Sequence, residues 1–519
     1  DLPRTSTERR DIANQLTTAL PSLDAATTEQ ALAGAVLGSL KPIILAEHVP
    51  YQDALKLATV TAQLPGISLE TVATRSYVDG EASAHLVGYL GKPTEKELAN
   101  DPDLSPFAEI GRMGVEQQYD EILRGTDGVR EVERDHLNKE LNIVDNREPI
   151  PGKNLVLTID KGLQNALSSA LKDTVTRLRV PGGSAVAIDP RSGAILAIAS
   201  QPSFNPNLFT TGGTTDEFAA VFDNPNHPLF FRPISGTYPS GSTIKPLVAT
   251  AALAEGVVSE RTTINSSGGF KVGPNFFPDW KSGGHGATDV RKALAESVNT
   301  FFYTVGGGHD DVDGLGIDRL ISYFQMFGLG QKLGVDLPAE ATGFIPTAEW
   351  RNRPNGDRWY LGDTYHLSIG QGFIDVTPLQ VASYTSAIAN GGKLFQPHVL
   401  SEVLNPDGTL DQAAAPAPYR TTVDDRFLAV VRSGMRQAVT SGSARALGDL
   451  PVPAAAKTGT AQFGEGDRTH AWLTSFAPFD RPEIVITVVV EQGGEGHAEA
   501  LPIAKAGLKY YFEHPSGTP

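Results

Sequence analysis

The stretch NLVLTIDKGLQNALSSALKDTVTRLRVPGGSAVAIDPRSGAILAIAS, residues 154–200, decides the fold. It begins with a strand-like segment, and residues 161–178 then place apolar side chains at the spacing of an amphipathic helix. Residues 183–200 hold two apolar runs separated by a turn around Gly193, which predicts a β-hairpin. The stretch therefore predicts a helix packed on an antiparallel sheet.

The C-terminal part of the chain repeats this pattern. Residues 471–479 and 484–490 are apolar runs typical of strands, and a helix is expected through residues 503–512. We therefore expect an α+β fold in which an antiparallel sheet is flanked by helices.

A change of pattern near Pro151 predicts a boundary between two domains. The densest glycine motif of the first part, GRMGVEQQYDEILRGTDGVREVERD, begins at Gly111 and predicts a helix over residues 118–123, followed by a strand. We expect a smaller, non-catalytic domain over residues 1–150 and a large catalytic domain over residues 151–519.

Composition excludes several functional classes. The 519 residues include 43 Lys and Arg against 60 Asp and Glu, a net charge of −17, which argues against nucleic acid as the main partner. Without cysteine, the chain has neither disulfides nor a thiolate metal site. No apolar run reaches the roughly 18 residues of a membrane-spanning helix. The polar start at Asp1 favours a processed or truncated form.

The first chemical motif is YPSGSTIKPLVATAALAEG, residues 238–256. Its apolar positions mark the buried face of a helix, and Pro246 is tolerated only near a helix start. Ser242 and Lys245 therefore share one face of the first turn, where free amides help to keep a lysine neutral. A neutral amine beside a hydroxyl activates a nucleophile, although a solvated helix pair would have the same spacing.

The second motif lies in RKALAESVNTFFYTV, where Ser297 and Asn299 precede an aromatic run. An extended link would direct both side chains to one cleft. The alternative is that these residues simply cap the following helix.

The third motif is AAAKTGTAQFG, which contains Lys457, Thr458, Gly459 and Thr460. On an edge strand, Gly459 lets a substrate backbone approach closely, while Lys457 and the threonines present donors to a carboxylate. Each motif alone is weak evidence, but three in this order and wide spacing rarely coincide.

The segments TYPSGSTIKP, ESVNTFFY and AAKTGTAQ resemble the three active-site motifs of the class B penicillin-binding proteins. The resemblance covers roughly residues 75–512. GRMGVEQQYDEILRG resembles the family's non-catalytic segment. Further blocks of the family's transpeptidase domain are matched in this sequence by LTIDKGLQ, AIDPRSGAILAIASQPSFNPN, SIGQGFIDVTPLQVA and HAWLTSFAP. The segments most similar to the elongation-type enzymes, penicillin-binding protein 2, are FFPDWKSGGHGATDVRKALAES, GIDRL and PTAEWRNR.

The resemblance implies a fold and an activity. The fold is a transpeptidase domain like that of the serine β-lactamases, preceded by a non-catalytic pedestal domain. The activity is a D,D-transpeptidase that cross-links peptidoglycan stem peptides ending in D-Ala-D-Ala through a serine acyl-enzyme, uses no cofactor and is acylated by β-lactam antibiotics.

The resemblance also implies residue roles. The catalytic residues would be Ser242, Lys245, Ser297, Asn299 and Lys457, and the substrate-binding residues Thr458, Gly459 and Thr460. Ser242 would attack the penultimate D-Ala carbonyl while neutral Lys245 takes its proton, and Ser297 would pass a proton to the leaving amine. The oxyanion would lie between the backbone N–H groups of Ser242 and Thr460.

Location and partners follow from the same resemblance. It implies a single-pass membrane anchor in the full-length protein and a catalytic domain on the extracytoplasmic, periplasmic side. The implied partners are a RodA-type glycosyltransferase and elongation-complex proteins such as MreC.

Some elongation-type relatives hold zinc near the active site, and Asp279 and His285 resemble two of its ligands. Val298 stands where the relatives have a cysteine. Two ligands without a thiolate make a poor tetrahedral site, so we expect no metal and a hydrogen-bonding role for His285 in its loop.

Three alternatives stay open from sequence. A division-type transpeptidase of the same family differs by its partners rather than its chemistry. A D,D-carboxypeptidase or β-lactamase shares the superfold, although the long segment ahead of the catalytic domain argues against a compact β-lactamase. A non-catalytic β-lactam sensor would need only acylation.

Overall fold

The chain forms two compact units, one of Asp1–Ser76 with Asn207–Thr214 and one of Tyr77–Pro206 with Thr215–Pro519. The predicted boundary near Pro151 falls inside the second unit and stays a prediction. The computed structural model describes residues 5–34, 43–64, 66–69, 71, 74–101, 104–105, 108–134, 140–346, 350, 358–415, 417–464 and 466–514. Asp135 of the glycine-rich segment and most of PTAEWRNR therefore lie outside the described residues.

The first unit is helical. Its helices are α1 (Ser6–Ala19), α2 (Ala25–Ala33), α3 (Tyr51–Thr61) and α9 (Asn207–Thr211). A capping box starts α1, because the Thr5 hydroxyl accepts from the Glu8 N–H and the Glu8 carboxylate accepts from the Thr5 N–H. Leu16 and Leu57 belong to its buried apolar cluster.

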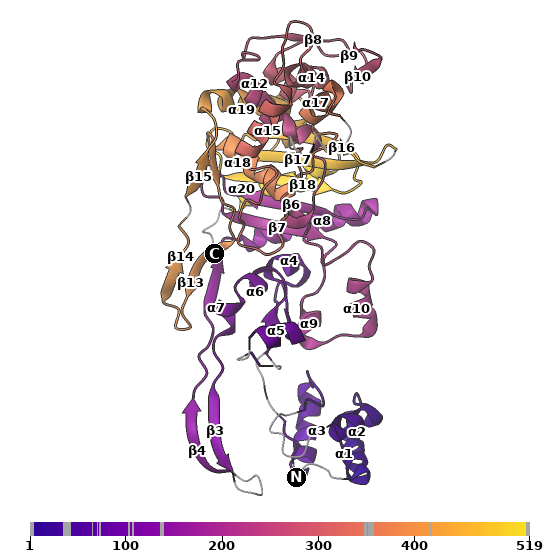
Figure 1. Ribbon diagram of the computed structural model, residues 1–519, viewed down its shortest axis with the longest axis vertical. Helices are drawn as coiled ribbons and strands as arrows, with labels where there is room; N and C mark the ends of the chain where they lie inside the picture. The colour runs from indigo at the N-terminus through magenta and orange to yellow at the C-terminus, as the bar shows by residue number, and fades with distance from the viewer. Residues whose placement is uncertain are drawn as a thin grey trace. The chain divides into compact units, whose positions relative to one another are not determined.

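A five-stranded antiparallel sheet, in the order β16-β17-β18-β6-β7, forms the centre of the second unit (Figure 1). Its strands are β6 (Gly183–Ile188), β7 (Ile195–Gln201), β16 (Ala455–Gln462), β17 (Thr469–Ala477) and β18 (Ile484–Val490). The predicted hairpin is confirmed, since Val186 of β6 pairs with Ile198 of β7. Every residue of β18 is buried, which fits its apolar sequence, and the hydroxyl of its one polar residue, Thr487, shares a hydrogen bond of 2.8 Å with Thr474. β16 is an edge strand, as predicted.

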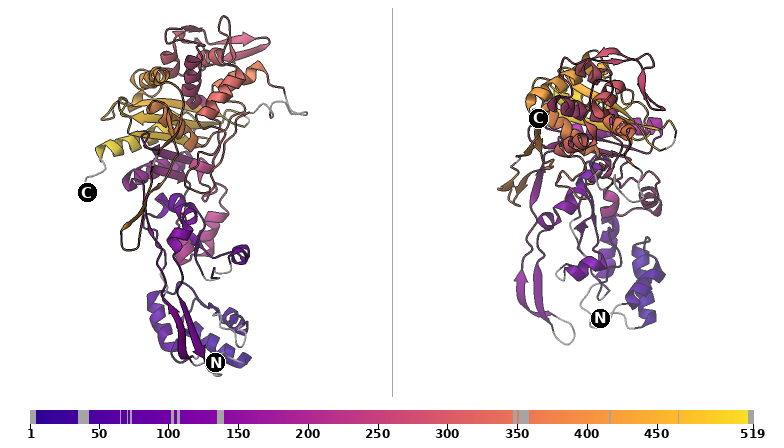
Figure 2. Two further views of the ribbon diagram at one scale, coloured as in Figure 1. Left: turned by 60° about the vertical axis from the view of Figure 1, so that its left-hand side comes forward. Right: turned by 45° about the horizontal axis from the view of Figure 1, so that its top comes forward.

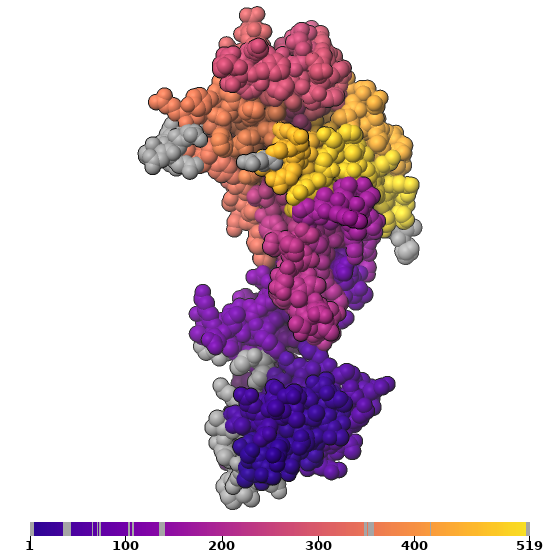
Figure 3. Space-filling model, turned by 90° about the vertical axis from the view of Figure 1, so that its right-hand side faces the viewer, coloured from indigo at the N-terminus to yellow at the C-terminus, as the bar shows by residue number. Residues whose placement is uncertain are grey.

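Helices cover both faces of this sheet. On one face, α8 (Lys161–Leu178) and α20 (Ala500–Glu513) pack against Ile486 and Val488 of β18, whereas Val485 and Val489 point to the opposite layer. α20 packs closely on α8 at Gly507, where an added Cβ would lie only 2.6 Å from the Leu167 side chain. Figure 3 shows the yellow C-terminal segment beside the magenta start of the catalytic fold.

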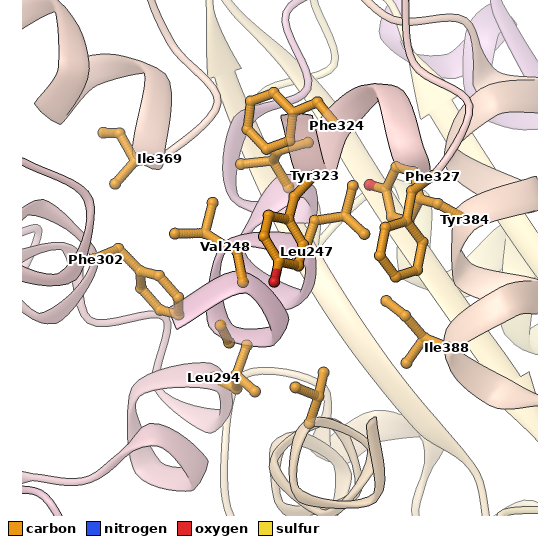
Figure 4. Close-up of a cluster of buried hydrophobic side chains, with 14 of the residues drawn as sticks. Leu247, Val248, Leu294, Phe302, Tyr323, Phe324, Phe327, Ile369, Tyr384 and Ile388 are labelled. Carbon is orange, nitrogen blue, oxygen red and sulfur yellow. The ribbon is translucent and has the colours of Figure 1, made fainter. Parts of the chain in front are cut away.

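The opposite layer is built around α12 (Lys245–Ala254), in which every residue except the last is buried. Figure 4 shows Leu247 and Val248 of α12 surrounded by Phe324, Tyr384 and other apolar side chains. The surrounding helices are α13 (Val290–Ala295), α14 (Asn299–Gly307), α15 (Gly316–Met326), α17 (Leu361–Ser368), α18 (Pro378–Ala389) and α19 (Asp425–Thr440). Two short antiparallel strand pairs border this layer: the hairpin of β9 (Gly269–Val272) and β10 (Asn275–Pro278), and the pair of β8 (Ile264–Ser266) and β11 (Gly286–Thr288), which encloses that hairpin in sequence.

The remaining elements of the second unit precede or border this core. They are η1 (Gly80–Ala82), α4 (Ala84–Val87), β1 (Leu90–Gly91), α5 (Glu95–Asn100), β2 (Ile110–Gly111), α6 (Gly114–Gln118), α7 (Asp120–Arg124), β3 (Val129–Arg134), β4 (Glu140–Arg147), α10 (Thr215–Phe222), α11 (Arg232–Ser235), β12 (Lys393–Phe395), β15 (Pro418–Thr421) and η3 (Arg445–Leu447). β3 and β4 form a long two-stranded ribbon (Figure 2). No helix among the described residues combines the length and apolar character needed to span a bilayer.

One local prediction differs from the structure, and the pairing of one predicted strand was not foreseen. The helix expected over residues 118–123 is broken at Tyr119, whose backbone is not helical and whose hydroxyl donates to Asp336 at 2.8 Å. The strand β5 (Asn154–Leu157) does not join the central sheet. It pairs with β13 (Leu400–Leu404), which also pairs with β14 (Leu410–Ala413). Neither the contact of Tyr119 with Asp336 nor the pairing of β5 with β13 could be predicted from the local sequence. The α+β architecture itself is confirmed.

The contact between α8 and α20 should carry a large share of the stability of the second unit. Leu167→Ala empties a fully buried position and should lower the free energy of unfolding by about 2–5 kcal/mol. Thermal unfolding of purified variants measures this. Lys172→Ala on the same helix removes only an exposed ion pair with Glu81 and should change stability by about 1 kcal/mol or less. Equal effects of the two substitutions would contradict the packing argument.

Candidate active site

Ser242 lies in a 3₁₀ turn, η2 (Gly241–Ile244), that leads directly into α12. Pro246 stands in the first turn of α12, as predicted. Gly241 has a φ of 51°, and a Cβ at this position would lie 2.8 Å from the carbonyl oxygen of Thr460. This glycine therefore allows the turn that carries Ser242 to pack against β16.

Lys245, the first residue of α12, is fully buried. Its Nζ donates to Asn299 Oδ1 at 2.6 Å, to the carbonyl oxygen of Ser297 at 2.8 Å and to Ser297 Oγ at 3.1 Å. Burial lowers the pKa of Lys245 to about 7, although the negative charge of Asp279 opposes this shift. A large fraction of the amine is therefore neutral near pH 7.

Ser297 links the two buried lysines. Lys457 Nζ donates to Ser297 Oγ at 2.9 Å and to the carbonyl oxygen of Thr458 at 2.9 Å. Burial and the charge of Lys245 lower the pKa of Lys457 well below its usual value. Because two buried ammonium groups on one hydroxyl would repel each other, at least one amine is neutral. The hydroxyl can then accept from one amine and donate to the other.

The backbone of the second motif is neither of the two arrangements considered from the sequence. Ser297 has a φ of 57°, in the left-handed region that is unfavourable for residues other than glycine. Val298 is the N-cap of α14, and Asn299 is its first residue. The left-handed turn directs the Ser297 carbonyl oxygen and the Asn299 side chain to the same amine, Lys245. The helix-capping alternative also fails, because the N-cap residue makes no side-chain cap.

The third motif occupies β16 at the edge of the central sheet. A Cβ on Gly459 would lie 2.9 Å from Trp472 and 3.0 Å from Thr243, so the glycine also permits η2 to pack on the strand. The Thr458 hydroxyl shares a hydrogen bond of 2.8 Å with Ser443. The structure thus brings residues of all three motifs together.

Sequence reasoning did not identify Glu495. Thr460 Oγ1 donates to Glu495 Oε2 at 2.7 Å. Glu495 follows β18 in a glycine-rich turn, and a Cβ on Gly496 would lie 2.2 Å from the Gly459 carbonyl oxygen, so this turn reaches β16 across β17. Only the strand order reveals this proximity.

Asp279 and His285 lie close together but do not fit a zinc site. His285 Nε2 is 3.7 Å from Asp279 Oδ1, and His285 Nδ1 is 2.6 Å from Glu296 Oε2. The Asp279 carboxylate already accepts hydrogen bonds from Thr300. Within the described part of the chain, no group of three or more His, Cys, Asp or Glu side chains could hold a metal ion. The buried Val298 offers no donor atom in place of a thiolate.

Comparison with known families finds two matches. The penicillin-binding protein transpeptidase domain matches residues 183–509, and the penicillin-binding protein dimerisation domain matches residues 3–157. The chain is 37% identical over 475 residues to the peptidoglycan D,D-transpeptidase MrdA of Acinetobacter baumannii, covering 88% of this chain and 69% of that protein.

Two solved structures are closely similar. The penicillin-binding protein PBP2 of Helicobacter pylori, solved in a complex with MreC, has a TM-score of 0.85 and 28% identity over 98% of this chain and 93% of that chain. The Pseudomonas aeruginosa PBP2 solved in a complex with WCK 5153 has a TM-score of 0.74 and 34% identity over 87% of this chain and 93% of that chain.

Gly241 should be needed to place Ser242. Gly241→Ala combines a left-handed backbone with a Cβ that crowds the Thr460 carbonyl oxygen. It should lower the free energy of unfolding by about 1–3 kcal/mol. It should also slow covalent labelling of Ser242 by a fluorescent penicillin, which gel fluorescence measures.

Gly256→Ala is a matched control. Gly256 also has a positive φ, of 69°, but nothing lies within 4 Å of its Cβ position. This variant should lose stability without losing labelling. If the two variants label equally fast, close packing of η2 on β16 does not position Ser242.

Proposed function

The chain belongs to the penicillin-binding proteins, in the elongation-type class B group, and from this membership we propose that it cross-links peptidoglycan as a serine D,D-transpeptidase that β-lactams acylate. The observation that carries this proposal is the hydrogen-bonded network of Lys245, Ser297, Asn299 and Lys457 beside the turn of Ser242. A serine, a partly neutral lysine and a second proton carrier are the groups that acyl transfer requires.

In the acylation step, Ser242 Oγ attacks the carbonyl carbon of the penultimate D-Ala in a donor stem peptide. A C–O bond forms, and the hydroxyl proton passes to neutral Lys245. The tetrahedral intermediate then collapses, the C–N bond breaks and the terminal D-Ala leaves as a neutral amine. The proton that this amine needs reaches it through Ser297, which hydrogen-bonds both lysines.

In the second step, an acceptor amine from a neighbouring strand attacks the ester carbonyl. A new C–N bond forms, the ester C–O bond breaks, and Ser242 recovers a proton that originates from the amine. One peptide bond is broken and another is made, so the reaction needs no cofactor. A β-lactam has a leaving group that stays tethered, so its acyl-enzyme persists.

Substrate recognition is assigned to β16. We propose that the Thr458 and Thr460 hydroxyls bind the terminal carboxylate and that the Gly459 backbone lies beside the substrate. The Ser242 and Thr460 N–H groups would stabilise the oxyanion, each contributing roughly 10²- to 10³-fold in rate. The close packing of Gly241 on Thr460 supports this pairing.

Partners and location belong to the same proposal. We propose that residues 1–150 form a pedestal domain and residues 151–519 the transpeptidase domain, a division that the two family matches support. We further propose a single-pass membrane anchor in the full-length protein and a periplasmic catalytic domain. Complexes with MreC and a RodA-type glycosyltransferase are proposed as well, and the MreC complex of the Helicobacter pylori relative supports the first.

Intact-mass spectrometry after incubation with a fluorescent penicillin tests the nucleophile. The wild type should gain one adduct that lasts for hours, and Ser242→Ala should gain none. A control variant, Ser203→Ala, changes a half-buried serine whose hydroxyl donates to the Glu81 carbonyl oxygen and should label like the wild type.

Other outcomes would indicate another function. Rapid loss of the adduct would favour a β-lactamase, and release of D-Ala from stem peptides without cross-links would favour a carboxypeptidase. A stable adduct with no cross-linking of lipid-linked peptidoglycan strands would favour a sensor. If the wild type gained no adduct, the assignment of Ser242 as the nucleophile would be wrong.

The acylation rate should depend on the protonation of Lys245. Its pKa of about 7 means that the reactive neutral amine predominates above pH 7 and is lost as the pH falls. Because the amine must accept the serine proton, the acylation rate constant should rise about tenfold per pH unit below 7 and level off above it. Stopped-flow measurement between pH 5 and pH 9 checks this, with thermal unfolding at each pH as the control. A flat profile would exclude Lys245 as the base.

A further inference from the structure

The helix that carries Asn299 begins without an acceptor of its own. The first N–H groups of a helix have no partner inside it, and an N-cap Ser, Thr, Asp or Asn usually accepts from them. The N-cap of α14 is Val298, whose aliphatic side chain cannot do so. Asn299 and Thr300 therefore depend on an acceptor from elsewhere in the chain.

Asp279, which directly follows β10, is that acceptor. Its Oδ1 accepts from the Asn299 N–H at 3.2 Å, and its Oδ2 accepts from the Thr300 N–H at 3.1 Å and from Thr300 Oγ1 at 2.5 Å. The Asp279 side chain is fully buried. Burial alone would raise the pKa of its carboxyl, but the hydrogen bonds from Thr300 and Asn299 and the charge of Lys245 hold the pKa below its usual value.

The carboxylate is itself held from the opposite side. Ser266 Oγ donates to Oδ2 at 3.1 Å, and the Trp280 N–H donates to Oδ1 at 2.9 Å. The His285 ring lies next to it, oriented by Glu296, and Trp280 Nε1 donates to the Glu296 carbonyl oxygen at 3.0 Å. These five hydrogen bonds, three from Asn299 and Thr300 and two from Ser266 and Trp280, fix the position of the Asp279 carboxylate.

We propose that Asp279 is a positioning residue for acylation, which caps α14 and so fixes the Asn299 amide against the Lys245 amine without a metal ion. The proposal rests on the function proposed above. It follows from a chain of contacts, because Asn299 Oδ1 accepts from Lys245 Nζ at 2.6 Å and the Asn299 backbone is anchored by Asp279. Of the two groups that resemble zinc ligands, the Asp279 carboxylate is occupied by hydrogen bonds, whereas the buried His285 Nε2 has no hydrogen-bond partner among the described residues and lies 3.7 Å from Asp279 Oδ1.

The negative charge of Asp279 has a second effect on the same amine. The Lys245 amine contacts the neutral groups of Ser297, Asn299 and Phe302, and the Lys457 amine of β16 lies on the other side of the Ser297 hydroxyl. Asp279 contributes the opposing negative charge. Removing that charge should therefore favour the neutral amine.

The test compares Asp279→Asn and Asp279→Ala with Asp289→Asn. Asp289 caps the neighbouring helix α13 by accepting from the Lys292 N–H at 2.8 Å, so it matches the chemistry without touching a motif residue. Penicillin acylation of Asp279→Ala should slow about 10- to 100-fold, the size typical of residues that orient a reacting group. Asp279→Asn should fall between Asp279→Ala and the wild type, because its amide oxygen restores one acceptor.

A pH profile separates positioning from a merely structural role. In Asp279→Asn the midpoint of the acylation profile should move to lower pH, whereas Asp289→Asn should leave it unchanged. An Asp279→Asn variant with the wild-type rate and midpoint would overturn the proposal. So would a rate loss equal to that of Asp289→Asn.

Hydrogen exchange and the zinc content of the purified protein do not depend on acylation. Hydrogen exchange of the peptide that contains residues 299–307 should speed up in Asp279→Ala, and unchanged exchange would overturn the capping role even if the proposed function were wrong. Purified wild type should contain no stoichiometric zinc, and EDTA should not change its labelling. Bound zinc, or labelling lost with EDTA, would contradict metal-free positioning.

Discussion

The site depends on the burial of two lysine amines around a single serine hydroxyl. Taking an ammonium group out of water is unfavourable, so Lys245 and Lys457 can lie together only if at least one gives up its proton. In the proposed mechanism, that requirement lets ordinary side chains serve as a base and a proton carrier. It also demands a dry, rigid enclosure, because water or movement between the amines would return both to their usual pKa.

The enclosure comes from three segments that are distant in the chain. The helix α12 is buried among other helices, α14 brings Ser297 and Asn299 to its first residue, and β16 supplies Lys457 from the sheet. Gly241 lets η2 pack on the Thr460 backbone, and Gly459 leaves room for the side chains of Thr243 and Trp472, so that any larger residue would hold the segments apart. The stability of the large apolar core offsets the unfavourable burial of charge and the left-handed Ser297.

Sequence patterns could predict what is encoded locally. The helix over residues 161–178, the hairpin after it and the last two strands of the sheet follow from periodicity, and the motif residues follow from their order. The conformation of Ser297 could not be predicted, because serine carries no signal for a positive φ. Asp279 and Glu495 could not be placed either, since their contacts depend on how separate strands and helices pack. The pairing of β5 with β13 could not be predicted for the same reason, because the two strands are distant in the sequence.

If Thr460 binds the ligand's carboxylate as proposed, its hydrogen bond to Glu495 means that binding exchanges one acceptor for another. A hydroxyl has one proton to donate, and here a protein carboxylate already accepts it. An anionic ligand that takes this donor replaces one carboxylate with another, so its affinity reflects the difference between two similar bonds. It must also displace a like charge, which makes recognition of the ligand's carboxylate sensitive to ionic strength. Neutral ligands that leave the hydrogen bond between Thr460 and Glu495 intact avoid this competition. Anionic and neutral ligands would therefore bind at β16 in two chemically different ways.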